Sequence, residues 1–167
     1  MSKLLRYHRN TDVCFVTSVT NDRRRILVEH SDLLLAALGK YSEQLQFRLI
    51  AYVILPDHFH GLIECGGNDI SKIMKLVKLS FSKSYRNRRG VLIGHVWQSR
   101  FWDHIIRDQE DMNRHIDYIH YNPVKHGLVE SPFGWKLSTI QQYLRDGYYS
   151  SEWGNRPMEL VGEFGDS

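Results

Sequence analysis

The sequence predicts an α+β fold: a ferredoxin-like antiparallel sheet in the order β-α-β-β-α-β-α, with helices on one face. Strand-like apolar runs alternate with apolar patterns at helical spacing, and a tight turn joins two of the runs. The 167 residues are 42% hydrophobic, which suits one domain with one core. We place that domain in residues 1–145. Residues 146–167 form a C-terminal tail that we expect to fold back over the functional site, to contact a ligand there, or to be mobile.

The elements follow from local patterns along the chain. Runs rich in β-branched and aromatic residues predict strands, and apolar residues that recur every three to four positions predict helices. The expected strands are 12–20, 47–55, 58–64 and 101–107, and the expected helices are 32–46, 70–88, 109–121 and, more briefly, 139–145.

Polar residues, glycine and proline mark where the helices begin and end. Ser31, Asp69 and Asp108 each precede a helical pattern and can accept a hydrogen bond from its first turn. Gly90 is expected to end the second helix and Pro123 the third, because proline lacks the backbone N–H that a helix uses.

The gross composition indicates a cytoplasmic protein without membrane segments. Cys14 and Cys65 each lie in an apolar run, which suits buried thiols in a reducing compartment better than a disulfide. No apolar run reaches about 18 residues, and the N-terminal residues lack the apolar core of a secretory leader.

Positive charge is concentrated on the second predicted helix. Residues 71–90 hold seven basic residues and no acidic one, whereas the other 15 basic residues (22 less 7) are outnumbered by 19 acidic ones. The seven are Lys72, Lys75, Lys78, Lys83, Arg86, Arg88 and Arg89. We interpret this helix as a contact for the nucleic-acid backbone, with a solvated face as the alternative. Trp97, Phe101 and Trp102 follow it and can stack on unpaired bases, although core packing is expected for at least two of them.

Two histidines on one predicted strand indicate half of a metal site. His58 and His60 are two residues apart, and alternate residues of a strand share a face. Histidine is the commonest metal ligand, and a strand holds the pair in fixed register. A lone pair of this kind is more often a solvated polar face, so the rest of the site decides the interpretation.

The predicted helix 109–121 supplies candidates for the other half. His115, Tyr118 and Asn122 fall on one stripe at its shoulder, spaced i, i+3 and i+7. A tyrosine phenol is a weak nucleophile near neutral pH, and a divalent metal that polarises a phosphate oxygen would make its attack feasible. Asn122 can add an amide oxygen as a third ligand. His115, together with His120, is expected to lie either at the surface or next to the site. Tyr121 is a rival nucleophile on another side of the helix.

Three segments resemble the REP-associated branch of the single-tyrosine transposases. Residues 52–60 are similar to the family's His-hydrophobic-His (HUH) motif, and residues 96–108 and 118–129 resemble its two further signatures. The three blocks occur in the family's order over a resemblance that spans residues 6–144. Together they are far more specific than the histidine pair alone.

The resemblance implies a single-stranded DNA nicking and joining enzyme that forms a 5′-phosphotyrosine. It places the nucleophile at Tyr118 and the metal ligands at His58, His60 and Asn122, with Mg²⁺ or Mn²⁺ as the ion. The implied substrates are hairpins from repetitive extragenic palindromes (REP sequences), which places the protein at the nucleoid. The resemblance is compatible with a monomer or a homodimer. A non-catalytic module that binds DNA or RNA hairpins is the alternative, and a rolling-circle nuclease is a third that the short chain disfavours.

Overall fold

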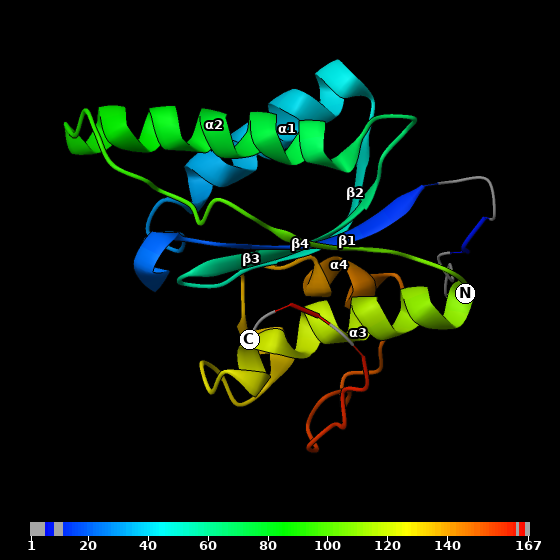
Figure 1. Cartoon of the computed structure of the whole chain (residues 1–167). Coiled ribbons are helices and arrows are strands. Elements are labelled where there is room, and N and C mark those ends of the chain that lie inside the picture. Colours follow the sequence, from blue (N-terminus) through cyan, green and yellow to red (C-terminus); the bar gives the residue numbers. More distant parts are fainter. Residues whose placement is uncertain (1–5, 9–11, 163, 166–167) are drawn as a thin grey trace.

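A four-stranded sheet lies between two helical layers in the computed structural model, which describes residues 6–8, 12–162 and 164–165 (Figure 1). The strands are β1 (Val13–Val19), β2 (Arg48–Ile54), β3 (His58–Glu64) and β4 (Trp102–Ile105). The helices are α1 (Ser31–Leu45), α2 (Ile70–Arg89), α3 (Gln109–Lys125) and α4 (Ile140–Arg145), with short 3-10 turns at Asn21–Arg23 and Pro132–Gly134.

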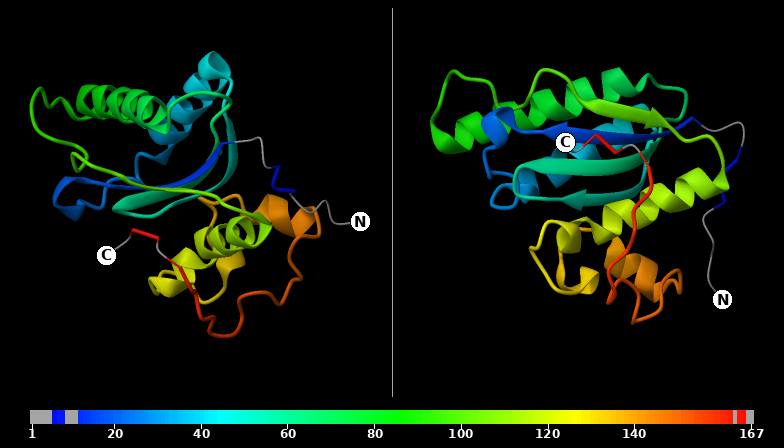
Figure 2. Two further views of the ribbon diagram at one scale, coloured as in Figure 1. Left: turned by 45° about the vertical axis from the view of Figure 1, so that its right-hand side comes forward. Right: turned by 60° about the horizontal axis from the view of Figure 1, so that its bottom comes forward.

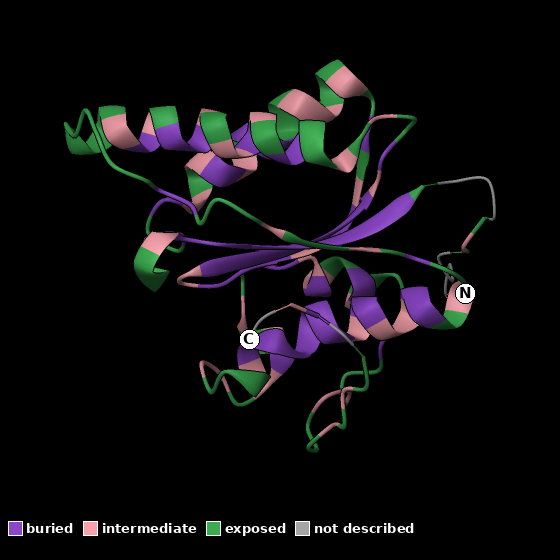
Figure 3. Ribbon diagram, in the orientation of Figure 1, coloured by how far each residue is buried: buried purple, intermediate pink, exposed green. Residues whose placement is uncertain are grey.

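The strand order β2-β3-β1-β4, antiparallel throughout, confirms the predicted fold class. The two helices of the ferredoxin-like unit, α1 and α2, cover one face together, as expected. The last helix lies on the other face, where α3 and α4 pack against a second core cluster (Figure 2). Both faces of the sheet are therefore covered, so every residue of β1 is buried (Figure 3). Along β1, Cys14 and Val16 face α1 and α2, whereas Val13 and Phe15 face α3.

The helix boundaries agree with the prediction except at two points. The side chains of Asp69 and Asp108 cap α2 and α3, each accepting a backbone N–H bond at 2.8 Å. Ser31 is not the cap of α1, because His30 takes that position without a side-chain bond. Pro123 does not end α3, which continues to Lys125. The proline deprives one carbonyl of its partner, but the proline is buried, and the helix closes normally beyond it, with a 3.0 Å bond from the His126 N–H to the Asn122 carbonyl.

The described part of the tail packs on the α3 side of the sheet. Tyr149 is 5% exposed and its hydroxyl donates to Asp117 on α3 at 3.0 Å. Trp153 stacks on Tyr149, with ring centroids 3.9 Å apart. The chain then returns alongside α3 toward the sheet (Figure 2), where Phe164 joins the second core cluster.

A buried histidine between α3, α4 and the tail predicts that acid destabilises the fold. His120 has no exposed surface, and its ring nitrogens lie 2.9 Å from the Tyr149 hydroxyl and 2.8 Å from Thr139 Oγ1. Burial lowers the pKa of His120 to about 3. The unfolded chain, with an ordinary histidine pKa near 6.5, therefore takes up this proton first as the pH falls. His120 should cost about 1.4 kcal/mol of unfolding free energy for each pH unit below about 6.5.

Urea unfolding at pH 7, 6 and 5 checks this expectation. The decrease of the unfolding free energy with falling pH should be smaller in His120→Gln and unchanged in His95→Gln, which changes an exposed histidine. Equal slopes in the wild type and His120→Gln would contradict it.

Candidate active site

The two histidines of β3 lie side by side on the face of the sheet that α3 covers. His58 is 2% exposed and His60 is fully buried, with ring centroids 4.9 Å apart. Phe59, between them, points into the core beneath α1 and α2. The predicted shared face is therefore confirmed, but the face is buried rather than solvated.

Hydrogen bonds orient both imidazoles. His58 Nδ1 lies 2.7 Å from Asp57 Oδ1, and because a carboxylate only accepts, Nδ1 carries the proton. Burial alone would raise the pKa of Asp57, but this bond and the nearby Arg23 guanidinium keep it below its usual range. His60 Nδ1 lies 2.8 Å from Thr17 Oγ1, whose own proton goes to the Phe164 carbonyl at 2.7 Å. Nδ1 of His60 is therefore also the donor, so both rings carry their lone pair on Nε2, the nitrogen that binds a metal.

Helix α3 brings Tyr118 against this pair and Asn122 one turn further along. The Tyr118 ring is 1% exposed, and its centroid lies 5.3 Å from that of His60. Asn122 is fully buried, and neither polar atom of its amide has a hydrogen-bond partner among the described residues. The same holds for His58 Nε2. Leaving a buried polar group unsatisfied costs about 1–3 kcal/mol, which indicates that a ligand completes this set.

The donor atoms fit a divalent cation. Two imidazole nitrogens and an amide oxygen are neutral ligands that leave coordination positions for phosphate oxygens and water. His126, just beyond α3, adds a further imidazole, with its ring centroid 5.0 Å from that of His58.

Lys125 contacts the candidate nucleophile, although no role was predicted for it. Its Nζ donates to the Tyr118 hydroxyl at 3.0 Å and lies 4.8 Å from the centre of the ring. An ammonium in this position stabilises negative charge on the phenol oxygen. Lys125 is seven residues from Tyr118 and so lies on the same face of α3, but the helix was predicted to stop before it.

The C-terminal segment covers the tyrosine. Phe164 stacks face to face on the Tyr118 ring, with centroids 3.7 Å apart and planes 7° from parallel. Its carbonyl accepts the hydrogen bond from the Thr17 hydroxyl, so both its side chain and its backbone hold it in place. A substrate that approaches this face of Tyr118 must displace Phe164.

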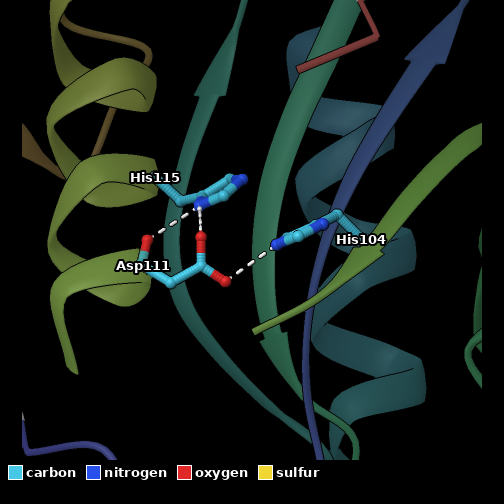
Figure 4. A group of neighbouring side chains, drawn as sticks. All are labelled: His104, Asp111 and His115. Atoms are coloured by element: carbon cyan, nitrogen blue, oxygen red, sulfur yellow. Dashed lines mark hydrogen bonds and ion pairs between the residues drawn. The ribbon is translucent and has the colours of Figure 1, made fainter. Parts of the chain in front are cut away.

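A second group of polar side chains, His104, Asp111 and His115, lies where β4 meets α3 (Figure 4). The Asp111 carboxylate lies 2.8 Å from His104 Nε2 and 3.3 Å from His115 Nδ1, which also bonds the Asp111 carbonyl at 2.8 Å. Burial would raise the pKa of Asp111, but its bonds from His104 and the Arg107 backbone lower it to about 2. The ligand atoms of His104, Asp111 and His115 lie within 4.8 Å of one another, so this group could also hold a metal ion.

His115 belongs to this second group rather than to the histidine pair of β3. Burial lowers its pKa, and its ring packs against Phe15 and Phe164, with centroids 4.7 Å and 5.1 Å away. Both His115 and Tyr118 contact the Phe164 ring. The predicted stripe of His115, Tyr118 and Asn122 is buried along α3, although its members serve two polar groups.

The rival tyrosine lies elsewhere. Tyr121 packs against Trp153 in the tail, with ring centroids 6.3 Å apart, and makes no ring contact with His58 or His60 among the described residues. This placement favours Tyr118 as the nucleophile.

The basic residues of α2 divide into two groups. Arg88 forms a two-bond ion pair with Asp32, Arg86 donates to the Gly94 carbonyl, and Lys78 donates to the Gln98 carbonyl at 3.0 Å. The other four are exposed and make no hydrogen bond or ion pair within the described part of the chain: Lys72, Lys75, Lys83 and Arg89. These four have no competing contact there, whereas Lys78 uses one of its three ammonium hydrogens on Gln98.

The family model for IS200-like transposases matches residues 9–122, and the chain belongs to that family. A protein of Escherichia coli K12 named REP-associated tyrosine transposase is 32% identical, over 92% of this chain and 91% of its own. A relative from Haemophilus influenzae, assigned to the same group, is 33% identical over 98% and 99% of the two chains. The chain is therefore a DNA-processing enzyme of the transposase class.

Solved structures agree. A REP-associated tyrosine transposase bound to a REP hairpin superposes with a TM-score of 0.78 at 30% identity, over 99% of this chain and 96% of that one. A protein from Deinococcus radiodurans, at 17% identity and a TM-score of 0.51, shows the shared fold alone. Among the described residues, no helix is long and apolar enough to cross a membrane.

Proposed function

We propose that this protein nicks and rejoins single-stranded DNA beside hairpins formed by repetitive extragenic palindromes, through a 5′-phosphotyrosine at Tyr118. The main support is the observation that a buried tyrosine lies beside two oriented imidazoles and an unsatisfied buried amide. A protein that only binds DNA has no need for this set. The relatives named for REP hairpins support the substrate class. A DNA substrate places the protein in the cytoplasm, at the nucleoid.

The residues around Tyr118 have distinct roles in the cleavage step. Lys125 donates to the Tyr118 oxygen and stabilises it as its proton leaves. That oxygen attacks a backbone phosphorus as the phenol proton passes to water, the bond from phosphorus to the 3′ oxygen breaks, and the 3′ oxygen takes up a proton from water to leave as a hydroxyl. Attack by a 3′-hydroxyl on the phosphotyrosine reverses the step and joins strands.

His58, His60 and Asn122 would hold the divalent metal. Mg²⁺ or Mn²⁺ bound there would offset the charge that develops on the phosphate oxygens. The deciding experiment incubates the full chain with single-stranded DNA from around its own gene, with Mg²⁺, Mn²⁺ or EDTA. A metal-dependent covalent adduct that maps to Tyr118 by mass spectrometry supports the proposal. Tight hairpin binding with no adduct under any metal would favour the binding module.

The stack of Phe164 on Tyr118 predicts that the tail slows adduct formation. Phe164→Ala removes the ring that stacks on Tyr118, and such aromatic pairs are worth about 0.5–1.5 kcal/mol, so the initial rate should rise roughly two- to tenfold. Val161→Ala, at an exposed position of the same segment, is the control and should leave the rate unchanged. An unchanged or lower rate in Phe164→Ala would mean that the segment does not compete with substrate.

The unpaired cations of α2 predict the salt dependence of hairpin binding. Lys72→Glu, Lys83→Glu and Arg89→Glu should each weaken binding and flatten the log–log salt slope by about 0.9 for every phosphate that the variant no longer neutralises. Fluorescence anisotropy with a labelled REP hairpin at several salt concentrations measures both. Lys40→Glu and Lys136→Glu reverse exposed charges outside α2 and serve as controls. Equal slopes in the two sets would show that α2 faces solvent in the complex.

A further inference from the structure

A groove of about 310 Å³ runs between α2 and residues 95–101, on the face of the sheet opposite Tyr118. Its walls include Lys75, Lys78, Leu79 and Arg86 from α2, and Trp97 and Phe101 from the following segment. None of the described residues that line it is acidic. The groove is therefore positively charged and partly aromatic.

Two hydrogen-bond donors in its walls lack acceptors. Trp97 Nε1 and Arg86 Nε are both buried, and neither has a hydrogen-bond partner among the described residues. Trp97 is only 7% exposed, so bulk water does not satisfy its N–H. Buried donors of this kind are rarely left unpaired, which indicates a ligand that carries acceptor atoms.

Two lysines give the groove its charge. Lys78 is half-buried, and its Nζ lies 6.0 Å and 5.8 Å from the ring centres of Trp97 and Phe101. Lys75 is exposed and makes no hydrogen bond or ion pair with the residues that the structure describes. A cation held against aromatic rings, beside a second, exposed cation, suits an anion that also offers a flat π surface.

We propose that this groove binds one unpaired nucleotide of the DNA substrate, with its phosphate at Lys75 and Lys78 and its base against the wall of Trp97 and Phe101. Its volume lies at the lower end of the range for small-molecule sites, which suits one nucleotide and excludes a duplex. The unpaired donors would bond the acceptors on the base or the phosphate. The ligand rests on the proposed function, because the DNA is the substrate of the same enzyme.

The position of the groove supports a path for the strand. The segment 95–101 leads directly into β4, which is one of the two edge strands of the sheet. His104 of β4 in turn stacks on His115 of α3, with ring centroids 4.7 Å apart. A strand that leaves a hairpin on α2 would enter the groove, pass around the β4 edge and reach Tyr118 on the other face.

Photochemical cross-linking tests the site directly and needs no catalysis. The probe is a ten-residue oligothymidylate with one central 5-iodouracil, irradiated with the full-length protein and mapped by mass spectrometry after trypsin digestion. We expect the label on the peptides 90–100 and 101–107, which contain Trp97 and Phe101. Label confined to other peptides would overturn the proposal.

Binding of fluorescein-labelled oligothymidylate to groove variants gives the second readout. Lys75→Gln and Trp97→Phe should each weaken binding roughly threefold or more, since one loses a charge and the other a donor while keeping a ring. Lys40→Gln and Trp153→Phe make the same changes outside the groove and should bind as the wild type does. Thermal melts identify any variant that is misfolded, and Leu79→Glu, at a position 57% exposed, adds a repulsive charge with little risk to the core. Normal binding by all three groove variants would refute the site.

The outcomes separate this proposal from the proposed function. If the wild type forms the Tyr118 adduct but the groove variants bind normally, the groove fails and the enzyme assignment stands. If the label maps to the groove but no adduct forms under any metal, the groove stands and the chemistry fails.

Discussion

Tyr118→Phe should abolish the covalent protein–DNA adduct and leave hairpin binding almost unchanged. The substitution removes only the hydroxyl, so the ring can keep its stack on Phe164 and its packing against Phe15 and His60. Loss of a nucleophile costs on the order of 10⁴-fold or more in rate, which takes the adduct below detection. Denaturing gels measure the adduct, and fluorescence anisotropy with a labelled REP hairpin measures binding.

Tyr121→Phe is the matched control, because it makes the same change one turn along the same helix. Its ring contacts Trp153 rather than the histidines, so it should nick DNA at close to the wild-type rate. Adduct formation that survives Tyr118→Phe and disappears in Tyr121→Phe would move the nucleophile to Tyr121.

Local patterns were sufficient for most of the fold and for one half of the site. The two-residue period of a strand put His58 and His60 on one face, and the structure confirms it. The spacing of His115, Tyr118 and Asn122 predicted one stripe on the shoulder of α3; the three residues do lie along α3, but they are buried rather than at the border of the core. These features depend only on the geometry of a single element, which a sequence determines by itself.

The partners of those residues were not predictable because they come from other elements. Thr17 reaches His60 through the register of β1 on β3, and Asp111 reaches His104 through the meeting of α3 with β4. Neither register nor docking leaves a periodic signal in one sequence. Phe164 lies in a segment without such a pattern, so its place on Tyr118 had no local signal.

The helix stop at Pro123 was wrong, and it shares a physical cause with the second covered face of the sheet, which was not predicted. Pro123 was taken to end the helix, whereas α3 continues to Lys125, which contacts Tyr118. The expected cover on one face is present as α1 and α2, but the continuously buried β1 requires cover on both faces. In each case tertiary burial outweighed the local rule: it stabilises the last turn of α3 after the proline, and it covers the second face of the sheet with α3.

The double variant His58→Ala, His60→Ala should lose both adduct formation and tight binding of Mn²⁺. The lone pairs that the Asp57 and Thr17 bonds direct onto Nε2 are then absent, and the site keeps only the Asn122 amide oxygen and the neighbouring His126 imidazole. The adduct should become undetectable, a loss on the order of 10³-fold or more. Calorimetric titration with Mn²⁺ reads the metal site without catalysis.

His104→Ala, His115→Ala is the matched control, because it removes two imidazoles from the group around Asp111. If the β3 pair holds the catalytic ion, the control should still bind Mn²⁺ and form the adduct. The reverse result, with Mn²⁺ binding abolished only in the control, would place the ion between His104, Asp111 and His115. His58 and His60 would then act as neutral donors and acceptors beside Tyr118, and the unsatisfied amide of Asn122 would have to bind the substrate itself.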